Sequence, residues 1–403
     1  MKILLLGEFS NVHNNLAEGL RALGHEVTTA NGGHGWSNYN RDIDLGRSFG
    51  VWGGISYLFR LLKALPKLCG YDIVQLVNPH FLHLKAERVI PIFNFLRKHN
   101  KGIVLCAMGD DYYYCYNHKH FKPLAYSDYN LGEKPRSTEF GERAYNECVG
   151  TAKEKLSREV AYWCDAVVSV IYEYWAPYDL VTDKDKNGIP IREKNHFIPL
   201  PIKMPEQVCP PPSDKLRVFL GYKKEFGAYK GTDIMMEVAN DLLKKYPDKM
   251  ELKLASNIPF AEYQHMMDNS DVMLDQVYSY GPGMNALLAL SKGIVCISGG
   301  EAVNYERMGE YDCRAIINVT PSYESVYMEL EKLILMPKDE LQALKEKSRE
   351  YVRRNHECVK VARQYEEIYK EILASPPALP RREGAVRRRP YQNVFFFIFH
   401  FAR

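Results

Sequence analysis

The start of the chain alternates between short apolar runs and segments with helical periodicity. Residues 2–7 form a short apolar run that ends in glycine, which predicts a buried parallel strand. Residues 11–23 place leucine and alanine at helical spacing, and Gly24 is suited to end that helix. The segment 25–30 follows directly and predicts a second strand. Strand, helix and strand in this order form a βαβ unit, so the pattern predicts a parallel sheet.

The same alternation continues to residue 200. The predicted strands are 71–77, 102–107, 166–171 and 196–200, and the predicted helices are 86–98 and 151–163. Two segments lack such a pattern: 31–54 is rich in glycine and asparagine, and 112–143 is rich in tyrosine. We predict a long loop at each of them, and long loops in an α/β core often carry functional residues.

A proline-rich segment, 201–214, separates this series from a second one. The chain is therefore predicted to be an α/β protein with two domains, 1–205 and 206–354. Sequence that is mostly helical follows to residue 371. The second series predicts strands at 216–221, 251–255, 271–275 and 293–298, and helices at 232–245, 260–269 and 283–291.

Composition fits this picture and excludes several classes of protein. The 403 residues are 46% apolar and 26% charged, a balance that lets each domain bury its own core. A formal net charge of +3 gives no support for a nucleic-acid partner. The nine cysteines include no CxxC pair, which favours reduced thiols in the cytoplasm. The first apolar run is too short for a signal peptide, and no stretch approaches the roughly 20 apolar residues of a membrane span, so we expect a soluble or at most peripheral protein.

Three segments of the second series resemble one known enzyme family. They are Val218–Gly231 (VFLGYKKEFGAYKG), Ile258–Asp271 (IPFAEYQHMMDNSD) and Tyr280–Gly293 (YGPGMNALLALSKG). In order and spacing they are similar to the donor-binding segments of the retaining family 4 of GT-B glycosyltransferases, and the similarity extends over residues 1–373. The resemblance implies two Rossmann-like domains whose parallel sheets face each other across a cleft. It also implies that a C-terminal helix, 355–373, packs back on the first domain.

The resemblance implies that the second domain binds a nucleotide-diphosphate sugar. The pyrophosphate of that donor gains negative charge as the glycosidic bond breaks, so cations and backbone N–H groups must stabilise it. Lys230, with Lys223 or Lys224 before it, is placed to form such a clamp without a metal ion or a cofactor. The helix that starts at Gly283 adds its dipole, and Gly281 and Gly283 allow close backbone approach. A solvated surface is the alternative interpretation of the lysines.

This sequence departs from the family at two positions. Family members carry two glutamates that flank the donor loop, and the corresponding residues here are Tyr280 and Leu288. Asn285 or Asp275 can supply hydrogen bonds in their place, and Glu301 follows the next strand and its glycine pair. The predicted donor-binding residues are Lys223, Lys224, Lys230, Tyr280, Gly281, Gly283, Met284, Asn285 and Glu301.

In the first domain, the loop after the first strand faces the cleft, because it leaves the carboxyl end of a parallel strand. This loop, with the helix and strand after it, resembles the first loop of the family. His13 is a catalytic candidate, and a structural role is the alternative for a single histidine. The loop lacks GxGxxG, which argues against a dinucleotide site. The residues predicted to contact the acceptor or a phosphate are Gly7, Ser10, Asn11 and Asn14.

Asp110 and Asp111 follow a strand at the same edge of the first domain. Related enzymes often have a His-Asp pair here, and this chain has Gly109 in the place of the histidine and keeps the acid. We predict that Asp110 or Asp111 hydrogen-bonds a sugar hydroxyl or the acceptor, and both are catalytic candidates. A helix N-cap or a loop turn is the alternative. No third acid or histidine is placed to complete a metal site, so we predict none.

Residues 374–403 differ in composition from the rest of the chain. They combine prolines and a cluster of arginines with a run of phenylalanines. One interpretation is a tether to a membrane surface, with cations for anionic headgroups and aromatic rings for the interface. A disordered extension is the other.

Three functions fit the sequence. The first is a retaining, metal-independent glycosyltransferase that moves a hexose to a glycan or lipid-linked acceptor in surface polysaccharide biosynthesis. It would act in the cytoplasm, or peripherally at the inner face of the membrane. The second is a catalytically silent GT-B protein that binds a nucleotide sugar or a partner enzyme, which the missing glutamates favour. The third is a sugar-nucleotide epimerase, which forms its product without an acceptor.

Overall fold

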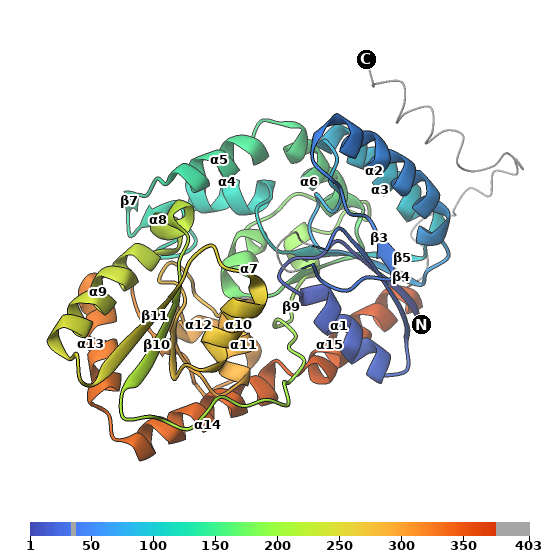
Figure 1. The fold of residues 1–403 in the computed structure, drawn as a ribbon. Coiled ribbons are helices and arrows are strands. Elements are labelled where there is room, and N and C mark those ends of the chain that lie inside the picture. Colours follow the sequence, from blue (N-terminus) through green and yellow to red (C-terminus); the bar gives the residue numbers. More distant parts are fainter. Residues whose placement is uncertain (34–37, 376–403) are drawn as a thin grey trace, which may run out of the picture.

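The computed structural model describes residues 1–33 and 38–375, and these form two α/β domains, each built on its own parallel sheet (Figure 1). The prediction of an α/β fold with two parallel sheets is confirmed. We call the part around the larger sheet the N-terminal domain and the part around the smaller sheet the C-terminal domain. The tail predicted at 374–403 lies outside the described residues from position 376 onward. Within the described part of the chain, no helix is long and apolar enough to cross a membrane.

The sheet of the N-terminal domain has seven parallel strands in the order β3-β2-β1-β4-β5-β8-β9. A short antiparallel pair, β6 (Asn130–Leu131) and β7 (Lys134–Pro135), lies apart from it. The seven strands are β1 (Lys2–Leu6), β2 (Glu26–Asn31), β3 (Ile43–Asp44), β4 (Ile73–Leu76), β5 (Gly102–Ala107), β8 (Ala166–Ser169) and β9 (Asn195–Phe197). The helices of this domain are α1 (Val12–Ala22), α2 (Gly50–Ala64), α3 (Ala86–His99), α4 (Tyr112–Phe121), α5 (Glu139–Cys148), α6 (Ala152–Trp163) and α7 (Tyr172–Asp179).

The sheet of the C-terminal domain has five parallel strands in the order β11-β10-β12-β13-β14. The strands are β10 (Leu216–Gly221), β11 (Met250–Ala255), β12 (Val272–Leu274), β13 (Val295–Ser298) and β14 (Ile317–Asn318). The helices after β10 are α8 (Gly227–Lys230), α9 (Thr232–Lys245), α10 (Phe260–Asp268), α11 (Met284–Ser291), α12 (Ala302–Met308), α13 (Tyr323–Leu335), α14 (Lys338–Asn355) and α15 (Cys358–Ala374).

The apolar run in β1 is continuous because helices cover both faces of its sheet. Leu4 and Leu6 belong to a core cluster with side chains of α2, α3 and α6. Ile3 and Leu5 belong to a second cluster with side chains of α1 and α15. Neighbouring side chains of a strand point to opposite faces, so each face needs its own apolar set.

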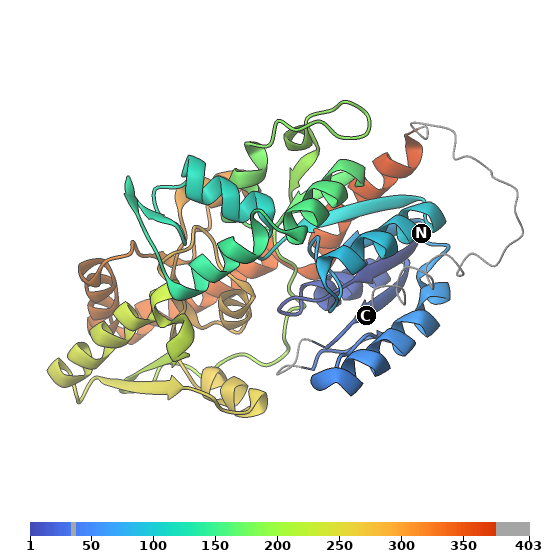
Figure 2. The ribbon, with the colours of Figure 1, turned by 90° about the horizontal axis from the view of Figure 1, so that it is seen from above.

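The last helix, α15, belongs in space to the N-terminal domain. The chain leaves the C-terminal domain along α14, and α15 then lies against α1 (Figures 1 and 2). The contact is close at Gly19, where an added Cβ would lie 2.1 Å from the carbonyl oxygen of Cys358. The hydroxyl of Tyr369 also donates to Oε1 of Gln75 in β4 at 2.5 Å. The two domains are therefore joined by the linker after β9 and by this returning helix.

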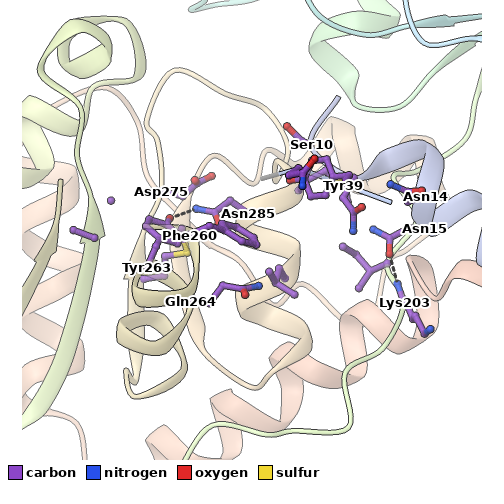
Figure 3. Close-up of a pocket in the computed structure, with 18 of the residues that line it drawn as sticks. Ser10, Asn14, Asn15, Tyr39, Lys203, Phe260, Tyr263, Gln264, Asp275 and Asn285 are labelled. Atoms are coloured by element: carbon purple, nitrogen blue, oxygen red, sulfur yellow. Dashed lines mark hydrogen bonds between the residues drawn. The ribbon is translucent and has the colours of Figure 1, made fainter. Parts of the chain in front are cut away.

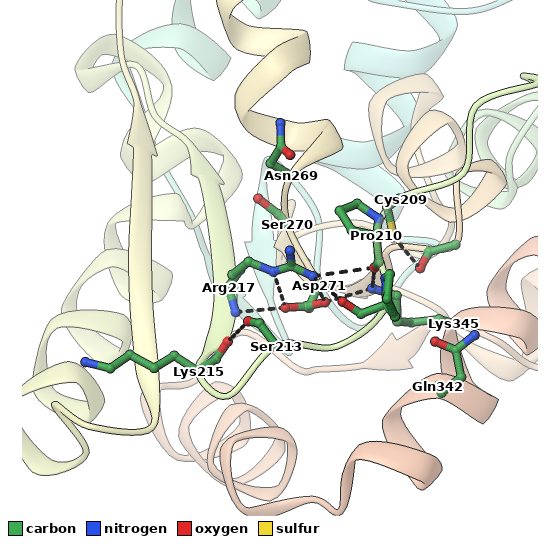
Figure 4. A network of polar contacts seen from close by, with 12 residues as sticks. Cys209, Pro210, Ser213, Lys215, Arg217, Asn269, Ser270, Asp271, Gln342 and Lys345 are labelled. Carbon is green, nitrogen blue, oxygen red and sulfur yellow. Dashed lines mark hydrogen bonds and ion pairs between the residues drawn. The ribbon is translucent and has the colours of Figure 1, made fainter.

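A buried ion-pair network fixes the linker on the C-terminal domain (Figure 4). The side chain of Asp271 is 0% exposed and accepts hydrogen bonds at 2.7 Å from Arg217 and from Lys345 of α14. Lys345 also donates to the carbonyl oxygen of Pro210 in the linker at 2.8 Å. One carboxylate thus ties together β10, the start of β12, α14 and the linker.

Both predicted long loops contain regular structure. The segment 31–54 holds β3 and the beginning of α2, and the segment 112–143 holds α4, the β6–β7 pair and the start of α5. Helix α4 was not apparent from the sequence because three successive tyrosines, 112–114, are all buried and leave no polar face to mark a period. The prediction of a structureless loop at 112–143 is therefore wrong.

Candidate functional site

A cavity of about 1340 Å³ lies between the two domains at the carboxyl ends of their strands. The loop after β1 and the start of α1 line one side, and the loops after β10, β11 and β12, with α10 and α11, line the other. Figure 3 shows the two groups of side chains across the gap, with Ser10, Asn14 and Tyr39 on one side and Tyr263, Asp275 and Asn285 on the other. Ligands of doubly wound sheets bind at this edge, since the loops there converge.

An aromatic wall closes the C-terminal side of the cavity. Tyr263 and Phe260 of α10 both line it. The Tyr263 hydroxyl accepts a hydrogen bond of 2.5 Å from Nδ2 of Asn285, and its ring meets Phe219 edge-on with centroids 5.0 Å apart. A Cβ on Gly221 would come within 2.9 Å of that hydroxyl, so glycine at the end of β10 makes room for it. The wall offers a flat apolar surface with one polar edge.

Lys230 and Asp275 bring a cation and a buried carboxyl to the same wall. Burial raises the pKa of the Asp275 carboxyl, while the positive charge of Lys230 and a hydrogen bond from Ser298 act to lower it. Lys230 is the last residue of α8, and its carbonyl oxygen accepts from the backbone of Val277 at 3.0 Å. Gly231 follows with φ 73°, and a Cβ there would lie 2.1 Å from a methyl of Val277. Glycine is required at this position, and it holds Lys230 at the cavity.

The other predicted donor-side residues divide into two groups. Lys223, Met284 and Asn285 line the cavity together with Lys230. Lys224, Tyr280, Gly281, Gly283 and Glu301 are not among its lining residues.

Tyr280 and Glu301 lie instead in the seam between the domains. The Tyr280 hydroxyl accepts from the backbone N–H of Ala125 at 2.8 Å, and its ring lies 4.8 Å from that of Tyr126. Glu301 accepts from the Tyr126 hydroxyl at 2.7 Å. A Cβ on Gly281 would lie 2.8 Å from the side chain of Asn304, so this glycine allows close packing in the same seam.

On the N-terminal side, the loop after β1 is in an unusual backbone conformation. Ser10 and Asn11 have φ of 51° and 73°, a left-handed region that non-glycine residues rarely adopt, and both line the cavity. Asn14 lines it too, and its Nδ2 is buried with no hydrogen-bond partner among the described residues. An unpaired buried amide donor in a cavity wall is available to a ligand.

Glu8 lies in the loop after β1, and its side chain reaches the N-terminus of α1. Its carboxyl accepts from the backbone N–H groups of His13 at 3.3 Å and Asn14 at 2.9 Å. Burial raises the pKa of Glu8 to about 8, although these hydrogen bonds act to lower it. The N–H groups that a phosphate would use at this helix are therefore already engaged. Gly7 itself packs against Val77 below the loop and does not line the cavity.

The three residues predicted to be catalytic lie outside the cavity lining. His13 is fully buried, with Nδ1 2.8 Å from the carbonyl oxygen of Gly7 and Nε2 3.3 Å from the Gln75 amide nitrogen, and burial lowers its pKa to about 4. Asp111 caps α4 by accepting from the backbone N–H of Tyr114 at 2.8 Å. This helix N-cap is the alternative to a catalytic role that the sequence leaves open. These two side chains hold loops in place rather than face a ligand.

Asp110 lies close to other acids. Burial and the charges of Asp128 and Asp111 raise the pKa of Asp110 to about 7. It does not line the cavity. In residues 1–33 and 38–375, no three histidine, cysteine or acidic side chains are grouped so as to hold a metal ion.

Sequence reasoning did not single out Tyr263, Phe260 or Tyr39, which all line the cavity. Aromatic residues of this kind are common in cores, and their placement depends on how α10 packs. The segment Ile258–Asp271 is similar to a donor-binding segment of the GT-B family, and this similarity is the one feature of the sequence that points to Tyr263 and Phe260.

The search against protein-family models and the search of curated proteins give no match for this sequence. Solved structures with the same fold are found. The chain is similar to sucrose-phosphate synthase from Thermosynechococcus elongatus, with TM-score 0.56 and 12% identity over 93% of this chain and 100% of the other. It is similar to Anabaena HepE in complex with UDP and glucose, with TM-score 0.54 and 11% identity over 92% and 100%.

A third similar structure is a putative UDP-N-acetylglucosamine 2-epimerase from Listeria monocytogenes, with TM-score 0.50 and 10% identity over 93% of this chain and 97% of the other. At such low identity these likenesses establish the fold and leave the activity open. The chain has the GT-B fold, with two Rossmann-like domains facing each other across a cleft.

Proposed function

We propose that this protein is a glycosyltransferase that moves a hexose from a nucleotide-diphosphate sugar to a glycan or a lipid-linked acceptor. The observation that carries the proposal is the cavity between the domains. It combines an aromatic wall, lysine side chains and buried hydrogen-bonding groups in a GT-B fold. HepE, which has a similar fold, binds UDP and glucose. The cavity of this chain has a volume of about 1340 Å³. That volume exceeds what a typical small ligand needs, which leaves room for donor and acceptor together.

The donor base would lie on the aromatic wall. Phe260 and Tyr263 present ring surface, and the Asn285–Tyr263 hydrogen bond adds polar atoms at its edge. The pyrophosphate would then reach Lys230 and Lys223 on the same wall. A lysine at the leaving diphosphate stabilises the charge that develops there, so the transition state gains more than the bound donor does.

The sugar would lie beside Asp275 and Asn285, toward Ser10 and Asn14 of the opposite domain. These groups can take over hydrogen bonds that the two glutamates make in the retaining family 4, whose positions here hold Tyr280 and Leu288. The acceptor would enter along the N-terminal side. We propose a metal-independent reaction with retention, in surface polysaccharide biosynthesis at the cytoplasmic side of the membrane.

The test measures binding and turnover separately. Calorimetric titration with UDP, GDP and ADP shows whether one nucleotide diphosphate binds, and incubation with the matching donor sugars shows whether the diphosphate is released. Binding with acceptor-dependent release supports a transferase. If none of the three diphosphates binds, the proposal is wrong.

A sugar-nucleotide epimerase is the second candidate, and the likeness to the Listeria protein favours it. The absence of Asp110, Asp111 and His13 from the cavity lining is compatible with either enzyme and also with a silent nucleotide-sugar binding protein. Conversion of the donor sugar without any acceptor identifies the epimerase. Nucleotide binding with neither conversion nor release identifies the silent protein.

A further inference from the structure

The outer face of α2 and the residue before it expose a group of large apolar side chains. Trp52 is 82% exposed and Phe59 is 56% exposed. Exposure of one such residue is ordinary, but a contiguous group on one face indicates an interaction surface. We call this group the α2 patch; it consists of Phe49, Val51, Trp52, Ile55 and Phe59.

Helical geometry brings the patch together. Trp52, Ile55 and Phe59 follow one another at the spacing that keeps side chains on one face of a helix. The opposite face is buried against the sheet and consists of Gly53, Tyr57, Leu61 and Ala64. Helix α2 is therefore apolar on both its inner and its outer face, and only the inner one has a partner among the described residues.

The stretch of chain that carries the patch contains basic residues and no acidic ones. Between Asp44 and Asp72 the sequence contains no aspartate or glutamate, and it contains four basic residues. Arg60 forms an ion pair with Asp44 at 2.9 Å. Lys63 lies about three helical turns after Trp52, on the same face of α2 as Trp52 and Phe59. The basic residues are Arg47, Arg60, Lys63 and Lys67.

We infer that the α2 patch docks on an anionic lipid bilayer. Tryptophan and phenylalanine enter the interfacial region, and lysine and arginine beside them contact the headgroups. The exposed Lys63 and Lys67 beside the patch complement lipid phosphates, which distinguishes a bilayer from a neutral protein partner. The position of the cavity is consistent with this docking. Residues 38–42 line the cavity, and the chain continues from them through β3 to α2. Docking would hold the rim of the cleft at the membrane, where a lipid-linked molecule could reach it.

The test is sedimentation of the full chain with vesicles of phosphatidylcholine, with and without phosphatidylglycerol. We expect binding to the anionic vesicles. The double variant Trp52→Ser/Phe59→Ser should weaken it at least about tenfold, because the inserted apolar area is lost. The variant Lys63→Glu/Lys67→Glu should weaken binding to anionic vesicles by a similar factor or more, because two attractive charges are removed and two repulsive charges are added.

A matched control is Met328→Ser/Leu335→Ser, which removes two exposed apolar side chains of α13 in the other domain and should bind vesicles as the unaltered chain does. UDP titration of the α2 variants keeps this proposal separate from the proposed function, since docking does not require nucleotide binding. Three results would overturn it. The first is that the chain does not bind anionic vesicles. The second is that Phe395→Ser/Phe396→Ser/Phe397→Ser abolishes binding while Trp52→Ser/Phe59→Ser still binds. The third is that the chain is a dimer in solution and that Trp52→Ser/Phe59→Ser converts it to a monomer.

Discussion

The hydroxyl of Tyr229 in the C-terminal domain donates a 2.9 Å hydrogen bond to Asp128 of the N-terminal domain, 101 residues away in the chain. Asp128 is buried and also accepts from the Tyr114 hydroxyl at 2.5 Å. Arg136 adds to this contact by donating to the carbonyl oxygen of Tyr229 at 2.9 Å. The neighbour of Tyr229 in the chain is Lys230. The N-terminal domain therefore holds the short helix that presents the lysine to the cavity.

The first prediction concerns this contact. Tyr229→Phe removes the hydroxyl and keeps the ring, so α8 loses one of its anchors on the N-terminal domain. We expect UDP to bind about 2- to 13-fold more weakly, because one hydrogen bond contributes roughly 0.5–1.5 kcal/mol. Calorimetry measures the change. Tyr246→Phe is the control: its hydroxyl donates to Glu331 at 2.8 Å, away from the cavity, and its loss should leave UDP affinity unchanged. Equal effects of the two variants would contradict the prediction.

The second prediction concerns Lys230 itself. Lys230→Ala should weaken UDP binding by roughly 10- to 150-fold, since a hydrogen bond to a charged group is worth about 1.5–3 kcal/mol. Lys224→Ala is a close control, because it removes the same charge from a residue that does not line the cavity. The difference in UDP affinity between the unaltered protein and Lys230→Ala should become smaller at high salt. Dissolved ions screen the attraction between Lys230 and the diphosphate, which only the unaltered protein has. If Lys224→Ala weakens binding as much as Lys230→Ala, the proposed clamp is wrong.

The fold could be predicted from the sequence where apolar runs are short and glycine ends them. β10 and α9 have the predicted bounds, and α1 begins and ends within a residue of its prediction. Helix α4 could not be predicted, because its tyrosines are buried through contacts with α5, α6 and α7 that no local pattern encodes.

The candidate site was predictable only in part. Lys230 stood out because it precedes a glycine in a segment that resembles a donor-binding loop. The structure shows that this glycine is needed, since a Cβ on Gly231 would lie 2.1 Å from a methyl of Val277. Tyr263 did not stand out, because its place in the cavity depends on α10 packing over Gly221. His13 and Asp111 show the opposite problem: their residue types suggest chemistry, yet each is buried with its hydrogen bonds directed at the protein. Sequence gives the residue type, while burial decides whether a ligand can reach it.

The third prediction concerns stability. Lys345→Met removes one of the two cations that hold the buried carboxylate of Asp271, leaving that charge only partly compensated. We expect the free energy of unfolding to fall by about 3–5 kcal/mol in urea titrations. Lys338→Met breaks an exposed pair with Asp214 and should change the free energy of unfolding far less than Lys345→Met does.

The same network has a pH signature. The hydrogen bonds and charges of Arg217 and Lys345 lower the pKa of Asp271 below its ordinary value of 3.8, although burial acts to raise it. A carboxyl with a lowered pKa stabilises the fold above that value and loses the contribution as pH falls through its folded pKa. Wild type should therefore lose its advantage over Lys345→Met in acid, below about pH 4. A stability difference that stays constant down to pH 2, about two units lower, would contradict this.

The last prediction concerns the carboxyl at the start of α1. Burial raises the pKa of Glu8 from its ordinary 4.5 to about 8, so the folded protein holds a proton there that the unfolded chain releases. Stability contributed by this group is complete below about pH 4.5 and declines as pH rises toward about 8. The N–H of His13 donates to Oε1 of Glu8 and the N–H of Asn14 donates to Oε2. Glu8→Gln cannot ionise and, like the protonated carboxyl, keeps one carbonyl oxygen, which can accept from Asn14. The variant should therefore gain stability relative to wild type between pH 5 and pH 8, about the interval between the two pKa values, in urea unfolding. Parallel pH profiles of the two proteins would show that Glu8 is ionised in the fold and that its carboxylate caps the helix as an anion.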